Sequence, residues 1–207
     1  MSRYTGADCR LCRREGCKLY LKGDKCMSPK CTILKKSNPP GMHQRSRRKE
    51  SGYSVQLREK QKIKRIYGLS EKQMRSYYDR ATLLRGVTGE LMLSMIERRL
   101  DNVVYRMGFA DSRDMARQMV NHGHFTVNGK NVDIPSYIVK SGDTIAVRDT
   151  KKDKTMWQSI KEIKNQSIAK WLEYDNTALT GKVLSLPERA DIDLDFKEHL
   201  VVELYSK

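Results

Sequence analysis

Hydrophobic residues in the first half of the chain follow helical spacing, and residues that suit helix ends separate the segments. The clearest start signal is the pair Ser70 and Gln73, which can form a capping box. Glycines close several of the segments, as expected of residues just beyond a helix end. The pattern predicts helices over 51–67, 70–84, 88–107 and 112–122.

After residue 124 the pattern changes to short apolar runs separated by turn residues, which is typical of β-strands. Asn128-Gly129 lies between two such runs and predicts a hairpin over 125–132 with a type I′ turn. Further strands are predicted at 137–139, 144–147 and 200–205, and a further helix at about 156–170. The fold class expected from these elements is α+β.

Four of the five cysteines form two close pairs, Cys9 with Cys12 and Cys26 with Cys31. Two such pairs can bring four thiolates around one ion, which closes the coordination sphere as in structural zinc sites. Zinc is the default metal, and an iron–sulfur cluster could use the same ligands. Cys17 lies in the intervening loop and is expected to be spare. The alternatives are five unconnected thiols or a reactive dithiol, although no thioredoxin-like pattern surrounds the pairs.

The chain has 41 Lys and Arg against 25 Asp and Glu, a net charge of +16. The excess lies in two stretches, with 14 basic and 4 acidic residues in 1–50 and 12 and 6 in 51–110. A solvated face is the alternative for a short charge run. An excess confined to half the chain favours a polyanion as partner, and nucleic acid more than an anionic membrane. The chain has no run of 18 apolar residues and no apolar signal core at its start.

Four arginines recur at helical intervals around two predicted helices, namely Arg99, Arg106, Arg113 and Arg117. Arg113 and Arg117 are four residues apart and share one helix face. The interpretation that favours function is a solvent-exposed, phosphate-binding edge, and the alternative is ordinary surface arginines. If Arg106, Arg113 and Arg117 are exposed, their replacement by alanine should cost little stability.

Residues 99–124 resemble the alpha-L RNA-binding motif of the family of ribosomal small-subunit protein four, bacterial or organellar type. The resemblance covers nearly the whole chain, through Arg3-Tyr4-Thr5-Gly6, Pro39-Pro40-Gly41 and residues 57–62, 65–68, 125–129, 132–137, 142–147 and 203–206. In the metal-binding branch of that family, the four ligand positions match Cys9, Cys12, Cys26 and Cys31. The family often has a second basic residue directly after the position of Arg113. Here that residue is Asp114, which shifts the expected RNA affinity toward the basic N-terminal half.

The resemblance implies a structural constituent of the small ribosomal subunit and not an enzyme. Such proteins bind the 5′ domain of small-subunit ribosomal RNA, nucleate assembly and contribute to decoding accuracy. The expected partners are that RNA, ribosomal proteins three and five, and messenger RNA where it enters the subunit, with no membrane and no small-molecule substrate. The expected location is cytoplasmic, in the small ribosomal subunit, or in an organellar ribosome. The predicted RNA-binding residues are Arg3, Arg10, Arg13, Arg14, Lys22, Arg45, Arg47, Arg48, Arg58, Lys60, Lys62, Arg65, Arg99, Arg106, Arg113 and Arg117.

The domain organisation expected is a mostly helical domain with an inserted alpha-L domain of helices and a small antiparallel sheet. A basic, metal-stabilised N-terminal arm would span 1–50. The helical domain would span 51–97 and be completed by 165–207, with the alpha-L RNA-binding domain at 98–164 between them. Two rival functions are an RNA-modifying enzyme that carries an alpha-L module and a free DNA-binding zinc protein. Too few residues remain for a catalytic domain, and no recognition helix follows the cysteines at zinc-finger spacing.

Overall fold

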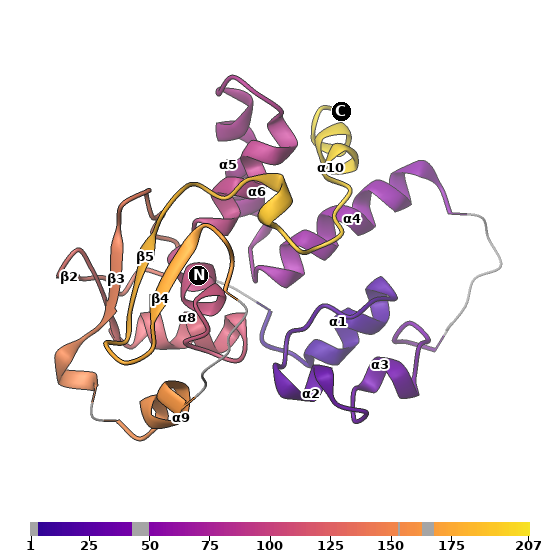
Figure 1. Ribbon diagram of the computed structural model, residues 1–207. Helices are drawn as coiled ribbons and strands as arrows, with labels where there is room; N and C mark the ends of the chain where they lie inside the picture. Colours follow the sequence, from indigo (N-terminus) through magenta and orange to yellow (C-terminus); the bar gives the residue numbers. More distant parts are fainter. Residues whose placement is uncertain (1–3, 43–49, 153, 163–167) are drawn as a thin grey trace. The chain divides into compact units, whose positions relative to one another are not determined.

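The computed structural model describes residues 4–42, 50–152, 154–162 and 168–207 (Figure 1). Its contacts divide the chain into two units, Met1–Leu93 with Leu194–Lys207, and Ser94–Asp193. The first unit therefore consists of two parts of the chain, and the second unit is inserted between them. Helices and a small antiparallel sheet both occur, which confirms the predicted α+β class.

The first unit is helical in its described residues. Its longest described helix, α4, has one buried side, on which Ile63 and Ile66 lie. Helix α6 continues from this unit into the first residues of the second. The helices are α1 (Asp8–Glu15), α2 (Asp24–Met27), α3 (Thr32–Lys35), α4 (Gly52–Ile66), α5 (Glu71–Thr82), α6 (Thr88–Glu97) and α10 (Glu198–Tyr205).

Side-chain caps fix where α4 and α5 begin, and the sequence pattern predicts the cap of α5. The Ser51 hydroxyl accepts a hydrogen bond from the Ser54 N–H at 3.2 Å at the start of α4. At the start of α5, the Gln73 N–H donates to the Ser70 hydroxyl and the Ser70 N–H donates to the Gln73 side chain. The capping box is thereby confirmed, and each cap satisfies amide groups that have no partner within the helix.

The strand predicted at 200–205 is wrong, because these residues belong to helix α10 (Figure 1). The helix packs against α4 and α5. Val201 is fully buried there, and the ring of Tyr205 lies 5.0 Å from the ring of Tyr78 in α5. Burial between two helices outweighs the strand preference of the Val201-Val202 pair.

In its described residues, the second unit contains two helices, a five-stranded antiparallel sheet and a further helix, with the strands in the order β2-β1-β3-β5-β4. Short 3₁₀ turns follow β3 at Asp149–Lys151 and follow β5 at Arg189–Asp191. The other elements are α7 (Leu100–Arg106), α8 (Arg113–Asn121), β1 (Phe125–Val127), β2 (Lys130–Asn131), β3 (Thr144–Val147), α9 (Met156–Glu162), β4 (Leu172–Asp175) and β5 (Thr180–Val183).

The predicted hairpin is present between β1 and β2, where Val127 pairs with Lys130. Asn128 has φ 50° and Gly129 has φ 76°, so both central residues are left-handed, as a type I′ turn requires. The Asn128 side chain also donates to the Asp143 carboxylate at 2.8 Å, which ties the turn to the start of β3.

The helix predicted over 88–107 is instead two helices, because the helical conformation is interrupted between Glu97 and Leu100. Arg99 has an extended backbone and forms a β-bridge with Ile138. The Leu100 N–H donates to the Tyr137 carbonyl at 2.8 Å. The strand predicted at 137–139 is reduced to this single bridge.

The segment that follows β3 also differs from the prediction. Strand β5 pairs with β3, and β4 pairs with β5, so the chain through Asp193 belongs to the second unit and does not complete the helical domain. The helix predicted at about 156–170 ends at Glu162 among the described residues. Residues 163–167 lie outside them, and 168–170 are not helical.

Aromatic rings fill the centre of the second unit. The ring of Phe109 lies 5.3 Å from Phe125, 6.0 Å from Trp157 and 4.8 Å from Tyr174, in edge-on arrangements. Phe109 lies three residues after the end of α7, and its partners come from β1, α9 and β4. The core therefore joins the helices to the sheet around one side chain. Among the described helices, none has the length and apolar character needed to cross a bilayer.

His124 is the buried histidine next to this core. Its side chain is 5% exposed, its ring lies 6.0 Å from Trp157, and its Nδ1 is buried without a hydrogen-bond partner among the described residues. Burial lowers the pKa of His124, and the charges of Lys154, Lys151 and His122 lower it further. The unfolded chain therefore takes up a proton on His124 more readily than the folded chain.

Because the folded-state pKa is depressed, His124 should make the protein less stable as the pH falls below about 6.5, the ordinary histidine value. Urea unfolding measures the free energy of unfolding at about pH 7.5 and about pH 5.5. We expect this free energy to fall between the two pH values, and to fall less in His124→Gln than in the unsubstituted protein. His122→Gln is the matched control, since His122 is exposed, and it should retain the loss seen in the unsubstituted protein. An equal pH dependence in all three proteins would show that His124 does not carry the effect.

Candidate nucleic-acid interface and metal centre

The predicted metal ligands lie on the three short helices of the first unit. Cys9 and Cys12 lie on α1, Cys26 lies on α2, and Cys31 is the N-cap of α3. Cys12, Cys26 and Cys31 are buried, and Cys9 is half-buried. Cys9, Cys26 and Cys31 all lie close enough to act electrostatically on the Cys12 thiol. The structure thus brings these four cysteines together.

Backbone amides point at two of these sulfurs. The Lys22 N–H donates to the Cys26 Sγ at 3.3 Å, and the Leu19 backbone forms a hydrogen bond with the Cys12 thiol. Burial, and to a smaller extent the three neighbouring thiols, raise the pKa of Cys12 to about 11, although the Leu19 hydrogen bond acts in the opposite direction. Four thiolates could share this place only with a cation among them.

Cys17 is separate from this group. Burial raises the pKa of its thiol, and the charged groups that act on it are Lys62, Glu15 and Glu59. All five cysteines are free thiols. The donor chemistry of the quartet suits zinc or an iron–sulfur cluster. As placed, however, no three Cys, His, Asp or Glu side chains of the described residues form a coordination shell.

The basic side chains of the N-terminal segment fall into two groups. Arg10 and Arg14 are exposed on α1, and Lys22 is exposed with a long ion pair of 3.6 Å to Asp8. Arg13 instead donates to the carbonyls of Asn38 at 2.8 Å and Pro39 at 3.4 Å, so it ties α1 to the loop after α3. Four other predicted RNA-binding residues, Arg3, Arg45, Arg47 and Arg48, lie outside the described residues.

Two predicted RNA-binding arginines of α4 bind one carboxylate of α1. Arg58 and Arg65 both form ion pairs with Glu15 Oε1, the first at 3.3 Å. The Glu15 side chain is 1% exposed, and burial raises its pKa, although Arg65 and Arg58 act in the opposite direction. These arginines therefore hold the cysteine-bearing segment to α4.

The lysines of α4 are also paired with carboxylates. Lys60 and Lys64 bind the two oxygens of Glu71 at 2.5 and 3.0 Å, and the Tyr205 hydroxyl donates to the same carboxylate. Lys62 binds Glu59 at 2.7 Å. The pairs around Glu71 join α4, α5 and α10, so this part of the predicted interface contributes to the fold of the first unit.

In the second unit, a buried carboxylate gathers two of the predicted arginines. Arg99 is fully buried and binds Asp101 through two nitrogens, at 2.6 and 3.0 Å. Arg117 of α8 binds the same carboxylate at 3.0 Å and is 8% exposed. The prediction that Arg117 is solvent-exposed is therefore wrong. Asp101 needs both arginines because a buried charge is costly without partners.

A second buried carboxylate, Glu97, holds Arg106. Arg106 donates to both Glu97 oxygens and, through Nη1, to Asp193 at 3.0 Å. Asn102 donates to Glu97 and accepts from Arg113 Nε at 2.8 Å. The Arg106 side chain is only 13% exposed, and Arg113 is half-buried. The predicted exposed edge is therefore largely a network of internal contacts.

Sequence reasoning missed exposed lysines elsewhere and the acids that bind the predicted arginines. Only local charge counts could have indicated the lysines, whereas Asp101, two residues after Arg99, was a visible signal for an internal pair. These exposed lysines are Lys25, Lys30, Lys35, Lys36, Lys72, Lys197 and Lys207 in the first unit and Lys130, Lys140, Lys154, Lys170 and Lys182 in the second.

Comparisons with known proteins agree with this architecture. Residues 3–97 match the family described as the ribosomal protein S4/S9 N-terminal domain, and residues 98–145 match the S4 domain. The small ribosomal subunit protein uS4 of Clostridioides difficile is 55% identical over 207 residues and the whole length of both chains. The chain belongs to the family of small ribosomal subunit protein uS4. The uS4 proteins of Caldicellulosiruptor saccharolyticus and Acetivibrio thermocellus are each 57% identical, again over both whole chains.

Family membership confirms the predicted resemblance, and it assigns the two matched segments to parts that the structure shows. The match to the S4 domain includes α7, α8, β1 and β2 and ends within β3. Strands β4 and β5 lie beyond that match, yet they extend the same sheet. The second unit is thus an S4 domain enlarged by two strands.

The burial of Arg117 reverses the stability expected from the sequence. Arg117→Ala should lower the free energy of unfolding by roughly 3 kcal/mol, because the buried Asp101 loses one of its two arginines. Arg113→Ala should cost about 1 kcal/mol, since its guanidinium lies 4.4 Å over the Tyr105 ring and makes a part-buried hydrogen bond. Urea unfolding measures both. If the free energy of unfolding falls by a similarly small amount in both variants, Arg117 is not a structural residue and the predicted phosphate-binding role stands.

Proposed function

We propose that the chain binds the 5′ domain of small-subunit ribosomal RNA and nucleates assembly of the small subunit. Its membership of the uS4 family makes it a structural, RNA-binding component of the small ribosomal subunit in the cytoplasm and not an enzyme. The observation that carries the proposal is identity of 55–57% to such proteins over the whole chain. The choice of the 5′ domain rests on the resemblance to ribosomal small-subunit protein four.

The exposed cations of α1, α2 and α3 are the surface that we assign to RNA in the first unit. Arg10, Arg14 and Lys25 are exposed, whereas Arg58 and Arg65 share the buried Glu15. A cation that faces solvent can neutralise a phosphate and so release the counterions of the RNA. A cation that is held by a buried carboxylate would leave that carboxylate unpaired if it moved to a phosphate, which is costly. Exposure thus supports the N-terminal segment over α4.

Further partners follow from the family resemblance. We propose contacts with ribosomal proteins three and five, a position beside the messenger RNA where it enters the subunit, and a contribution to decoding accuracy. The rigid, charged surface supports recognition of folded RNA by shape and phosphates. The low aromatic content of 7% is consistent with this, because single-strand binding relies on stacked aromatic rings.

We also propose a structural metal on Cys9, Cys12, Cys26 and Cys31, with zinc as the expected ion and an iron–sulfur cluster as the alternative. The grouping of these thiols and the amide hydrogen bonds to two sulfurs support it. The metal would cross-link α1, α2 and the start of α3, which bury few apolar residues of their own. Zinc in such a site is structural, because four thiolates leave no open ligand position.

Elemental analysis of the purified protein should find about one zinc per chain, or several irons with sulfide if the site holds a cluster. Cys17→Ser should leave the metal content unchanged, since the Cys17 thiol faces Lys62 and Glu15 rather than the quartet. Cys31→Ser should reduce it. The ligand assignment is overturned if Cys17→Ser loses the metal and Cys31→Ser keeps it.

RNA affinity should depend mainly on the N-terminal cations. We expect Arg10→Gln, Arg14→Gln and Lys25→Gln together to lower the slope of log affinity against log salt by about one per lost phosphate contact. Lys130→Gln, Lys140→Gln and Lys182→Gln form the matched control, because they also remove three exposed charges but lie in the second unit. The measurement is binding to a 5′-domain transcript over a range of salt concentrations.

The same titrations test the function itself. The unsubstituted protein should bind the 5′-domain transcript more tightly than an unrelated folded RNA of equal length. Equal affinity for the two RNAs would refute the proposed target, whereas a slope that changes only in the control set would move the binding surface to the second unit.

A further inference from the structure

Arg106 lies between two carboxylates of very different character, those of Glu97 and Asp193. On one side it donates to both oxygens of Glu97, whose side chain is 1% exposed. On the other side its Nη1 donates to Asp193 at 3.0 Å, and the Asp193 side chain is 81% exposed. Glu97 therefore fixes the guanidinium in place, whereas Asp193 covers it from solvent.

The two contacts differ in how easily they can be exchanged. Removing Arg106 from the buried Glu97 would leave a charge without water or partner, which is costly. An exposed ion pair such as that of Asp193 contributes little, because water screens it and solvates both groups when they separate. Another anion can thus replace Asp193 at Arg106 without disturbing Glu97.

A pocket of about 190 Å³ lies beside this contact, and its charged lining residues are Arg106, Lys170, Asp191 and Asp193. Lys170 is exposed. The volume is below the range of about 300–1,000 Å³ for pockets that enclose a metabolite. The pocket therefore suits one anionic group of a larger molecule, and the two cations that line it suit a phosphate.

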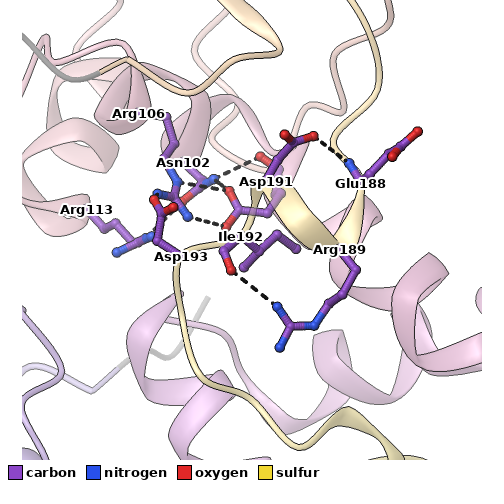
Figure 2. Close-up of polar contacts among 9 residues, drawn as sticks. Asn102, Arg106, Arg113, Glu188, Arg189, Asp191, Ile192 and Asp193 are labelled. Carbon is purple, nitrogen blue, oxygen red and sulfur yellow. Dashed lines mark hydrogen bonds and ion pairs between the residues drawn. The ribbon is translucent and has the colours of Figure 1, made fainter.

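The chain before Asp193 is held in place independently of that side chain (Figure 2). The Glu188 N–H donates to the Asp191 carboxylate at 3.0 Å, and Arg189 donates to the Ile192 carbonyl at 3.2 Å. Ile192 is buried. The Asp193 carboxylate can consequently leave Arg106 by side-chain rotation while the loop remains folded.

We propose that the Asp193 carboxylate occupies the place of an RNA phosphate on Arg106, and that a backbone phosphate of the bound RNA displaces it and binds between Arg106 and Lys170. The inference rests on the proposed function, since it names one contact of the same RNA interface. Asp193 weakens the binding of any anion at this position, so only a phosphate presented by an otherwise matched RNA displaces it. The contact thereby favours specific over indiscriminate RNA binding.

The test compares Asp193→Asn with Asp191→Asn in the full-length protein. Both variants remove one negative charge from the same pocket, but only Asp193 binds Arg106. Asp193→Asn should raise the affinity for the 5′-domain transcript about two- to fivefold, the change expected when one exposed ion pair no longer has to be broken. Asp191→Asn should raise it less. An equal gain in both variants, or no gain in Asp193→Asn, overturns the proposal.

Lys170→Ala locates the phosphate. This exposed side chain can be removed without loss of stability, and the salt slope should fall by about one. In the Lys170→Ala background, Asp193→Asn should no longer raise the affinity, because the phosphate has lost its second cation. If the two fold-changes simply multiply in the double variant, the two residues do not share a phosphate and the proposal is wrong.

The Arg106 Nε–H resonance gives a readout that needs no substitution at the pocket. It should shift when the 5′-domain transcript is added and remain in place with inorganic phosphate at the same phosphate concentration. A shift with inorganic phosphate alone would identify a free anion, and not RNA, as the ligand. Failure of the unsubstituted protein to prefer the 5′-domain transcript would instead refute the proposed function, whatever Arg106 does.

Discussion

The arrangement of the second unit depends on the buried carboxylate of Asp101. It accepts hydrogen bonds from Arg99 at the break between α6 and α7, from Arg117 in α8 and from the backbone of Asn102. Three separate positions are thereby fixed by one charge that cannot stay unpaired in the interior. The extended residue at Arg99 then lets the chain bridge to Ile138, and α7 starts in a new direction. Glu97 repeats the arrangement one turn earlier with Arg106 and Asn102.

The same use of charge explains why arginine spacing alone is a poor guide to the RNA interface. Glu15 and Glu71 in the first unit and Glu97 and Asp101 in the second each bind two or more cationic or hydrogen-bonding groups. The acids that hold these cations are few and mostly buried, while many exposed lysines have no comparable partner among the residues that the structure describes. A strongly basic protein can therefore use its longest cationic side chains to build its interior and still present a positive surface.

Local signals were enough to predict part of this structure. The capping box at Ser70 and the Asn128-Gly129 turn depend on neighbours within three residues, and the structure has both. The break at Arg99 and the helical state of α10 depend on partners far along the chain, so the local pattern was misleading there.

The candidate site divides in the same way. The spacing of the cysteines predicts the quartet, and the structure places Cys9, Cys26 and Cys31 near enough to Cys12 to act on its thiol. The ion pair of Arg65 with Glu15 joins residues 50 positions apart, and that of Arg106 with Asp193 joins residues 87 positions apart. No short-range pattern reports such a pair.

The return of the chain to the first unit has a consequence for the order of folding during synthesis. Helix α4 has α10 as its packing partner, and the whole second unit is translated between the two. At roughly 5–20 residues per second, the chain between Ile66 at the end of α4 and Glu198 at the start of α10 takes about 7–26 seconds to be made. The part of α4 that α10 covers lacks its partner during this interval, when the S4 domain can already fold. The first unit is therefore begun first during translation but completed last, after the second unit.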